Sequence, residues 1–255
     1  MNIILFSEKD RKGESFVFEQ GDERYSHITK VLKLKTGDSF KAGIINSELG
    51  MAHIKEMKKD KIIFDFVANA RPSPLHPLHL ILGIPRPIQL KRLLKDVATM
   101  GVSSIHLVGT VLGEKSYITS SLIANNEIGK HLIEGVAQAG STLIPSHHIY
   151  SSLYVALEQN AILGKNELKA HNVRRLLFDV ENANAKETLP LDSVFAKDEE
   201  FVLAIGSERG WVKSERELFK KQSFSTVTLG NRIMRCETAT IAAISYVLSK
   251  LGWNA

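Results

Sequence analysis

Two short runs that are almost wholly apolar, residues 176–180 and 201–205, constrain the fold of this chain more than any other feature. Runs of this kind are typical of parallel strands that are buried on both faces of a sheet. Strand-like and helix-like segments alternate around them. We expect strands at 79–84, 104–108, 176–180, 201–205 and 224–229, and helices at 89–100, 123–139, 213–221 and 237–251. The alternation predicts an α/β fold with a parallel sheet.

Prolines indicate a domain boundary, because five of the seven lie between residues 72 and 87. Residues 71–77 are expected to form no helix and to make a poor strand, since proline has a fixed φ and no backbone N–H. We therefore predict two domains, 1–72 and 73–255. Before the boundary, a small β-barrel is favoured by short alternating segments at 15–19, 39–45, 51–57 and 61–67, with a short helix at 25–34.

The composition, with 44% hydrophobic and 24% charged residues, is that of an ordinary soluble globular protein. No run approaches the roughly 18 apolar residues of a membrane span, and we predict no signal peptide. The single cysteine, Cys236, allows no internal disulfide and favours a reducing, cytoplasmic compartment. The histidines form no metal-binding motif, so we expect no metal site.

The net charge of +5 is concentrated in one stretch. Residues 209–235 contain seven Lys or Arg and two Glu, so their balance of 7 − 2 = +5 equals that of the whole chain. The stretch suits RNA phosphates, and a solvated helix face over 213–221 is an equally good interpretation.

Two arginines, Arg232 and Arg235, lie on the turn between the last predicted strand and the last predicted helix. Gly230 and Asn231 break the strand. The helix that follows has apolar residues at helical spacing, and we expect these to form its buried face: Ile241, Ile244, Leu248 and Leu251. In open α/β sheets, ligands bind at the carboxyl ends of the strands, so this turn is a candidate site.

Three motifs resemble those of the RsmE family in the SPOUT superfamily. They are Leu-Gly-Asn-Arg-Ile-Met-Arg-Cys-Glu-Thr-Ala at 229–239, Ile-Gly-Ser-Glu-Arg-Gly at 205–210, and His-Ile-Thr-Lys-Val-Leu-Lys-Leu at 27–34. Members of this family methylate N3 of a uridine in small-subunit ribosomal RNA with S-adenosylmethionine. The resemblance implies a PUA-like RNA-binding β-barrel over 1–72 and a SPOUT domain with a parallel sheet and a trefoil knot over 73–255.

The resemblance also implies a homodimer that buries the last helix, although this helix would equally pack within its own chain. Its implied partner is ribosomal RNA or the small ribosomal subunit. Basic residues that would face the RNA are His27, Lys30, Lys33, Arg86, Lys91, Arg92 and Arg209. His27 has a second interpretation, as a residue that serves the fold.

S-adenosylmethionine would bind through three loops, of which the third is residues 178–181. Taken alone, the loop at Gly206 would be a structural turn. Paired with the loop at Gly230, it forms half of a cleft. The residues implied in cofactor binding are Leu203, Ala204, Ile205, Gly206, Gly210, Leu229, Gly230, Ile233, Met234, Thr238 and Ala239.

Methylation at uridine N3 requires removal of its proton and stabilisation of the resulting anion. Arg232 and Arg235 are the candidates for charge stabilisation, and Glu208 and Glu237 are the candidates for proton acceptance or orientation. The arginines would alternatively form structural ion pairs with these acids or with a second subunit. Glu237 would alternatively offset the dipole of the helix that it opens.

Several positions depart from the family pattern on the RNA side, notably Arg209, Ala137 and Ser141 in place of glycine, glutamate and arginine. Two rival functions follow. The first is a SPOUT ribose 2′-O-methyltransferase, because Gly206-Ser207-Glu208 is similar to the loop of that branch. The second is a paralogue that binds RNA without catalysis, which the changes at Ala137 and Ser141 would suit.

Overall fold

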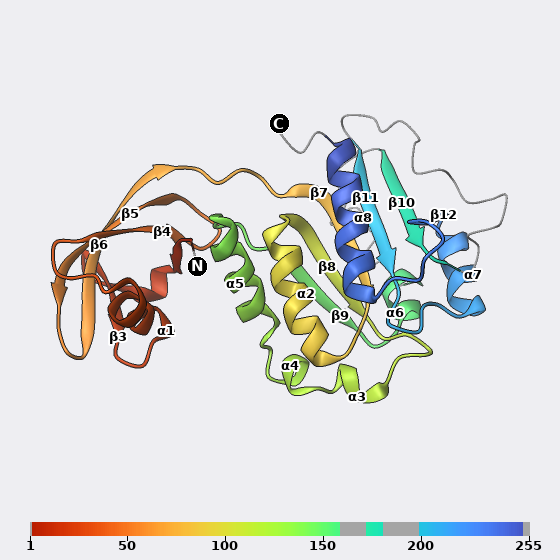
Figure 1. The fold of residues 1–255 in the computed structure, drawn as a ribbon, viewed down its shortest axis with the longest axis horizontal. Coiled ribbons are helices and arrows are strands. Elements are labelled where there is room, and N and C mark those ends of the chain that lie inside the picture. Colours follow the sequence, from red (N-terminus) through yellow and green to blue (C-terminus); the bar gives the residue numbers. More distant parts are fainter. Residues whose placement is uncertain (1, 159–171, 181–198, 252–255) are drawn as a thin grey trace. The chain divides into compact units, whose positions relative to one another are not determined.

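A computed structural model of the chain describes residues 2–158, 172–180 and 199–251 (Figure 1). The chain divides into two compact units. The first contains Met1–Pro74 together with Leu132–Ile144, and the second contains Leu75–His131 together with Pro145–Ala255. None of the helices formed by the described residues has the length and apolar character needed to cross a bilayer.

The first unit is built on a six-stranded sheet with the strand order β1-β4-β5-β6-β3-β2. Only β1 and β4 run parallel, and every other neighbouring pair is antiparallel. The strands are β1 (Ile4–Phe6), β2 (Arg11–Lys12), β3 (Ser15–Glu19), β4 (Ser39–Ile44), β5 (Leu49–Met57) and β6 (Lys61–Ala70). Its short helical segments are η1 (Glu8–Asp10), α1 (Glu23–Ser26) and the π-helical η2 (His27–Leu32).

Aromatic rings fill the core of the first unit. Phe64 is fully buried at its centre. Its ring lies 4.7 Å from Phe18, 5.4 Å from Phe6 and 5.6 Å from Phe40, measured between centroids. Large rings bury much apolar surface for each residue, so this small sheet obtains a core from few side chains.

Residues 132–144 complete the first unit, although residues 75–131 separate them from the rest of this unit in the sequence. The backbone N–H groups of Asn2 and Ile3 donate to the carbonyl of Ala137 at 3.2 and 3.3 Å. Thr142 is fully buried, and its carbonyl accepts from the N–H of Asn46 at 2.8 Å. A Cβ on Gly43 would clash with the Thr142 side chain, so glycine allows β4 to approach this segment.

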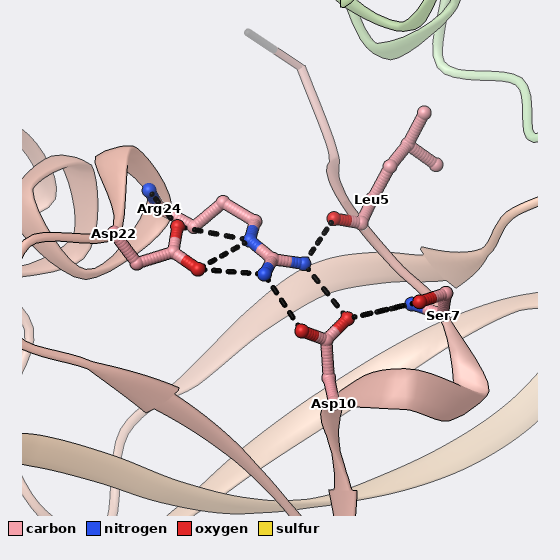
Figure 2. Close-up of polar contacts among 5 residues, drawn as sticks. All are labelled: Leu5, Ser7, Asp10, Asp22 and Arg24. Atoms are coloured by element: carbon pink, nitrogen blue, oxygen red, sulfur yellow. Dashed lines mark hydrogen bonds and ion pairs between the residues drawn. The ribbon is translucent and has the colours of Figure 1, made fainter.

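A partly buried ionic cluster around Arg24 joins three segments of the first unit (Figure 2). The Arg24 guanidinium donates to Asp22 at 2.6 Å, to Asp10 at 2.7 Å and to the carbonyl of Leu5 at 3.3 Å. Burial raises the pKa of Asp10, but hydrogen bonds from Arg24 and Ser7 and the charge of Arg24 outweigh it, so this pKa lies below its usual value. The cluster therefore links β1, η1 and α1.

The second unit is built on six parallel strands in the order β12-β10-β11-β7-β8-β9. The strands are β7 (His76–Gly83), β8 (Val102–Val108), β9 (Ser146–Tyr150), β10 (Val173–Phe178), β11 (Glu200–Ile205) and β12 (Ser225–Val227). The helices after β6 are α2 (Pro87–Thr99), α3 (Lys115–Ile118), α4 (Ser121–Ala124), α5 (Ile128–Ala139), α6 (Leu153–Glu158), α7 (Lys213–Lys221) and α8 (Cys236–Lys250).

Helices cover both faces of this sheet. On one face, Ile81, Val202 and Ala204 form a buried cluster with side chains of α6 and α7. The alternate residues of these strands point to the other face, where α2 and α8 lie side by side (Figure 1). Residues 201–205 and 176–179 of the two predicted apolar runs are buried here, as expected of strands covered on both sides. Val180 lies beyond the end of β10 and is exposed, so the predicted strand at 176–180 is too long by two residues.

Several predicted elements need correction. The helix at 123–139 is split into α4 and α5, because Asn126 adopts a left-handed φ of 54°. Strand β7 begins at His76, with Pro77 at an irregularity in its pairing with β8. Strand β12 covers only Ser225–Val227 of the predicted 224–229.

The buried face of α8 also differs from the prediction. Ile244 and Leu248 are buried as expected, whereas Ile241 and Leu251 are partly exposed. Mostly small residues form the rest of its buried stripe, and the spacing of large apolar residues alone does not predict them. The buried residues are Cys236, Thr240, Ala243, Ile244, Val247 and Leu248.

The substitution Arg24→Met is expected to destabilise the first unit by about 2–3 kcal/mol, because it leaves Asp10 and Asp22 without their partner in a mostly buried site. The measurement is urea unfolding, monitored by hydrogen exchange in peptides from residues 2–74. The matched control, Glu8→Gln, breaks an exposed ion pair with Arg11 and should leave the midpoint unchanged. Equal effects of the two substitutions would contradict a structural role for the Arg24 cluster.

Candidate functional site

A pocket of about 860 Å³ lies at the carboxyl ends of neighbouring strands in the second unit. The connections after β10, β11 and β12 line it with residues 178–180, 205–211 and 229–237, except Asn231. Arg86 and Gln89, which follow β7, line it as well. The pocket therefore occupies the edge of the sheet where parallel α/β folds bind ligands.

Most of the predicted site residues meet in this pocket. All four predicted catalytic residues line it: Arg232, Arg235, Glu208 and Glu237. So do eight of the residues predicted to bind the cofactor: Ile205, Gly206, Gly210, Leu229, Gly230, Ile233, Met234 and Ala239. Leu203 and Ala204 are fully buried inside β11, and Thr238 is outside the lining. Phe178, Asp179 and Val180 of the third predicted loop line the pocket, whereas Glu181 lies outside the described residues.

The two arginines are exposed and available to a ligand. Neither Arg232 nor Arg235 forms an ion pair or a side-chain hydrogen bond with any residue that the structure describes. The described residues thus show no ion pair of either arginine with Glu208 or Glu237, the alternative within this chain. Two uncompensated cations on one turn favour an anionic or polarised ligand.

The two glutamates differ in their partners. Glu208 Oε1 accepts a hydrogen bond from the backbone N–H of Arg86 at 2.9 Å. Glu237 lies in the first turn of α8, where the helix dipole favours an acid. Its Oε2 atom is buried and has no hydrogen-bond partner among the described residues. Glu237 therefore lines the pocket and has one carboxylate oxygen that no described residue satisfies.

Cys236 stabilises the loop beneath the pocket. Its thiol donates to the carbonyl of Gly206 at 3.2 Å, and the side chain is buried. Burial, together with the nearby charges of Glu208 and Glu237, raises the pKa of this thiol to about 12. Cys236 is therefore a neutral thiol at physiological pH.

Gly206 is a position where only glycine fits. A Cβ there would lie 2.8 Å from Cα of Gly210 and 3.3 Å from Nε1 of Trp211. Gly210 closes the turn by donating its N–H to the carbonyl of Ser207 at 2.9 Å, with a left-handed φ of 67°. Glycine at position 206 thus lets the loop fold tightly back on itself beside the pocket that it lines.

Other residues that fix the pocket were missed by the sequence analysis. Arg216 of α7 donates to the buried carboxylate of Asp179 at 2.6 Å. Glu215 is also buried, and its two oxygens accept from the N–H groups of Val111 and Val212 at 2.9 Å. An acid three residues into a helix is a known N-terminal signal, so Glu215 was detectable. Arg216 had no such local signal.

The residues predicted to face RNA fall into two groups. His27, Lys30 and Lys33 belong to the first unit, where His27 is half-buried and the lysines are exposed. In the second unit, Arg86 donates to the hydroxyl of Tyr117 at 3.2 Å, and Arg209 lies 3.6 Å from Glu114. Two further basic residues are on α2: Lys91, which lies 3.5 Å from Glu127, and the exposed Arg92.

Comparisons with known proteins agree with this architecture. Residues 71–248 match the model of the RNA methyltransferase domain, and residues 21–67 match the RNA methyltransferase PUA domain. The ribosomal RNA small subunit methyltransferase E of Treponema pallidum is 41% identical over 251 residues, covering 98% of this chain and 91% of that protein. Methyltransferase E 1 of Borreliella burgdorferi is 34% identical, covering 98% and 99%.

Solved structures share the fold. The crystal structure of ribosomal RNA small subunit methyltransferase E from Neisseria gonorrhoeae, bound to S-adenosyl methionine, is similar with a TM-score of 0.75. The two chains are 19% identical, and the similarity covers 99% of this chain and 100% of that one.

The fold, the pocket and the match over residues 71–248 define an RNA methyltransferase with an N-terminal PUA domain. More closely, the chain belongs to the ribosomal RNA small subunit methyltransferase E family. The resemblance drawn from the three sequence motifs is thereby confirmed, as is the predicted α/β fold with a parallel sheet.

The single thiol of the chain is expected to be unreactive in the native protein. With a pKa of about 12, Cys236 is ionised to roughly one part in ten thousand at pH 8, and the thiolate is the reactive form. Treatment with dithionitrobenzoate at pH 8 should release no chromophore until guanidinium is added. Cys236→Ala should remain unreactive in both conditions. Rapid modification of the native protein would contradict the buried, neutral thiol.

Proposed function

We propose that this protein transfers a methyl group from S-adenosylmethionine to N3 of a uridine in small-subunit ribosomal RNA. The observation that carries the proposal is the pocket in which Arg232 and Arg235, without partners among the described residues, line the same wall as Glu208 and Glu237. The names of the two similar bacterial proteins support the RNA, and the cofactor in the Neisseria structure supports the methyl donor.

The lining fits a cofactor with an apolar face and several polar edges. Leu229, Ile233 and Met234 offer apolar contacts, and Gly206 lines the same pocket. Buried polar atoms of the wall that have no partner would be satisfied by such a ligand; they belong to Gln89, Trp211 and Glu237. When bound, S-adenosylmethionine supplies a methyl group already activated by its sulfonium. We assign its binding to the eight predicted residues that line the pocket.

The side chains of the pocket would perform the remaining chemistry. Removing the N3 proton leaves negative charge on the uracil ring and its carbonyl oxygens, and Arg232 and Arg235 would stabilise this charge. We assign proton acceptance to Glu237, because its Oε2 atom is free among the described residues. Glu208, whose Oε1 atom is engaged by Arg86, would orient the base.

The RNA would contact both units. Residues 1–72 would form the RNA-binding domain and 73–255 the methyltransferase domain, and the matched ranges 21–67 and 71–248 support this division. His27, Lys30 and Lys33 would bind phosphates in the first domain. Around the pocket, the corresponding residues would be Arg86, Lys91, Arg92 and Arg209. Lys91 pairs with Glu127 and Arg209 pairs with Glu114, and both ion pairs are partly or fully exposed. RNA phosphates would therefore replace these glutamates at little cost in free energy.

We also propose a homodimer joined through α8, a trefoil knot in the second unit and a cytoplasmic location. The partly exposed Ile241 and Leu251 support the dimer, because they leave apolar surface on α8 outside the core of the chain. The knot is proposed from family membership. The single cysteine supports a reducing compartment.

Purified protein incubated with radiolabelled S-adenosylmethionine and unmodified small ribosomal subunits is expected to place label in N3-methyluridine. Nucleoside digestion and chromatography identify the product. Label in a 2′-O-methyl nucleoside would reject uridine N3 and favour the ribose branch suggested by Gly206-Ser207-Glu208. Binding of RNA and cofactor without label would instead indicate a paralogue that does not catalyse.

Arg232→Ala and Arg235→Ala are each expected to lower the single-turnover rate by about 10²- to 10³-fold, the usual cost of losing one group that stabilises transition-state charge. Affinity for S-adenosylhomocysteine should change little, because the arginines act on the base. The matched control is Lys220→Ala, an exposed cation of α7 outside the pocket, which should retain the full rate. Wild-type rates in both arginine variants would refute their catalytic assignment.

A further inference from the structure

Trp211 has a buried hydrogen-bond donor with no partner. Its side chain is 2% exposed, and its indole Nε1 atom has no acceptor among the described residues. The residue lies on the wall of the pocket. Folded proteins seldom leave a buried N–H unsatisfied, and those that do commonly satisfy it with a ligand or water. Together with Gln89 and Glu237, Trp211 has a buried polar atom that a bound ligand would satisfy, and its geometry identifies the donor more closely.

Core packing fixes the orientation of the indole ring. Trp211 packs edge-to-face on Phe219 with centroids 4.9 Å apart, and Phe219 packs in the same way on Phe224 at 4.9 Å. All three rings belong to the buried cluster between the sheet and α6 and α7. Because interiors are close-packed, the ring has no room to turn its N–H toward another protein acceptor.

The indole N–H lies beside the loop already assigned to the cofactor. A methyl group on Gly206 would be 3.3 Å from Trp211 Nε1, so the two are neighbours. The carbonyl of Gly206 accepts a hydrogen bond from the Cys236 thiol and makes none with the indole. A bound ligand or an ordered water would therefore supply the acceptor that the described residues do not.

We propose that the Trp211 indole N–H donates a hydrogen bond to an acceptor atom of bound S-adenosylmethionine. The inference rests on the proposed function only in taking this cofactor as the ligand. It adds a side-chain donor to a site otherwise assigned to backbone groups, apolar side chains and acids. Trp211 is then a cofactor-binding residue whose ring is pre-oriented by the core.

Affinity for S-adenosylhomocysteine tests the proposal by calorimetry. Trp211→Phe keeps an aromatic ring against Phe219 and removes the donor, so the dissociation constant should rise about 2- to 12-fold for a neutral acceptor and more for a carboxylate. Phe219→Leu is the matched control, because it disturbs the same packing and keeps the donor. An equal loss in both variants, or none in Trp211→Phe, would overturn the proposal.

A spectroscopic measurement reports on the hydrogen bond even if Trp211→Phe fails to fold. The chain has two tryptophans, so Trp253→Phe leaves Trp211 as the single indole signal in a ¹H–¹⁵N spectrum. Adding S-adenosylhomocysteine should move the indole proton downfield and slow its exchange with water. Calorimetric binding with an unmoved indole signal would refute this inference alone, whereas failure of the wild-type protein to bind would refute the proposed cofactor.

Discussion

The site depends on the parallel direction of four adjacent strands, β12, β10, β11 and β7. Parallel strands place their carboxyl ends along one edge of the sheet, so connections that are far apart in the sequence meet there. Every segment of the pocket follows one of these strands, apart from Arg216 of α7. Antiparallel pairing of any one of them would move its loop to the opposite edge. The sheet therefore determines which residues can act together before any side chain is considered.

Hydrogen bonds then fix the loops that the sheet has gathered. Asp179 is held by Arg216, Gly206 by Cys236, and the N–H of Arg86 by Glu208. Each bond joins the ends of different elements, so the wall of the pocket is cross-linked. Preorganised groups lose little free energy to reorganisation when charge develops on a substrate. The exposed arginines are the exception, since they have no partner among the described residues and remain free to adapt to RNA.

Sequence analysis located the parts of the site that lie in continuous motifs. Arg232 and Arg235 were identifiable because a strand, a glycine break and a helix surround them within a few residues. Gln89 and Trp211 were missed because their place on the wall depends on packing between distant elements, which leaves no local pattern. The division of the helix at 123–139 had a weak signal in Asn126, since asparagine tolerates a left-handed backbone. The prediction of which residues of α8 are buried was only half right, because small residues share the buried face with Ile244 and Leu248.

The first unit includes residues 132–144, whose carbonyl at Ala137 binds the N–H groups of Asn2 and Ile3. This closure has a consequence for synthesis on the ribosome, where chains emerge from the N-terminus at about 5–20 residues per second. The sheet of residues 4–70 emerges first, while the segment that buries Thr142 against Gly43 is still unmade. The first unit therefore remains incomplete until residues 75–131, about a third of the second unit, have also emerged. The two units mature together, and a gene fragment that ends at residue 74 encodes a sheet without its closing segment.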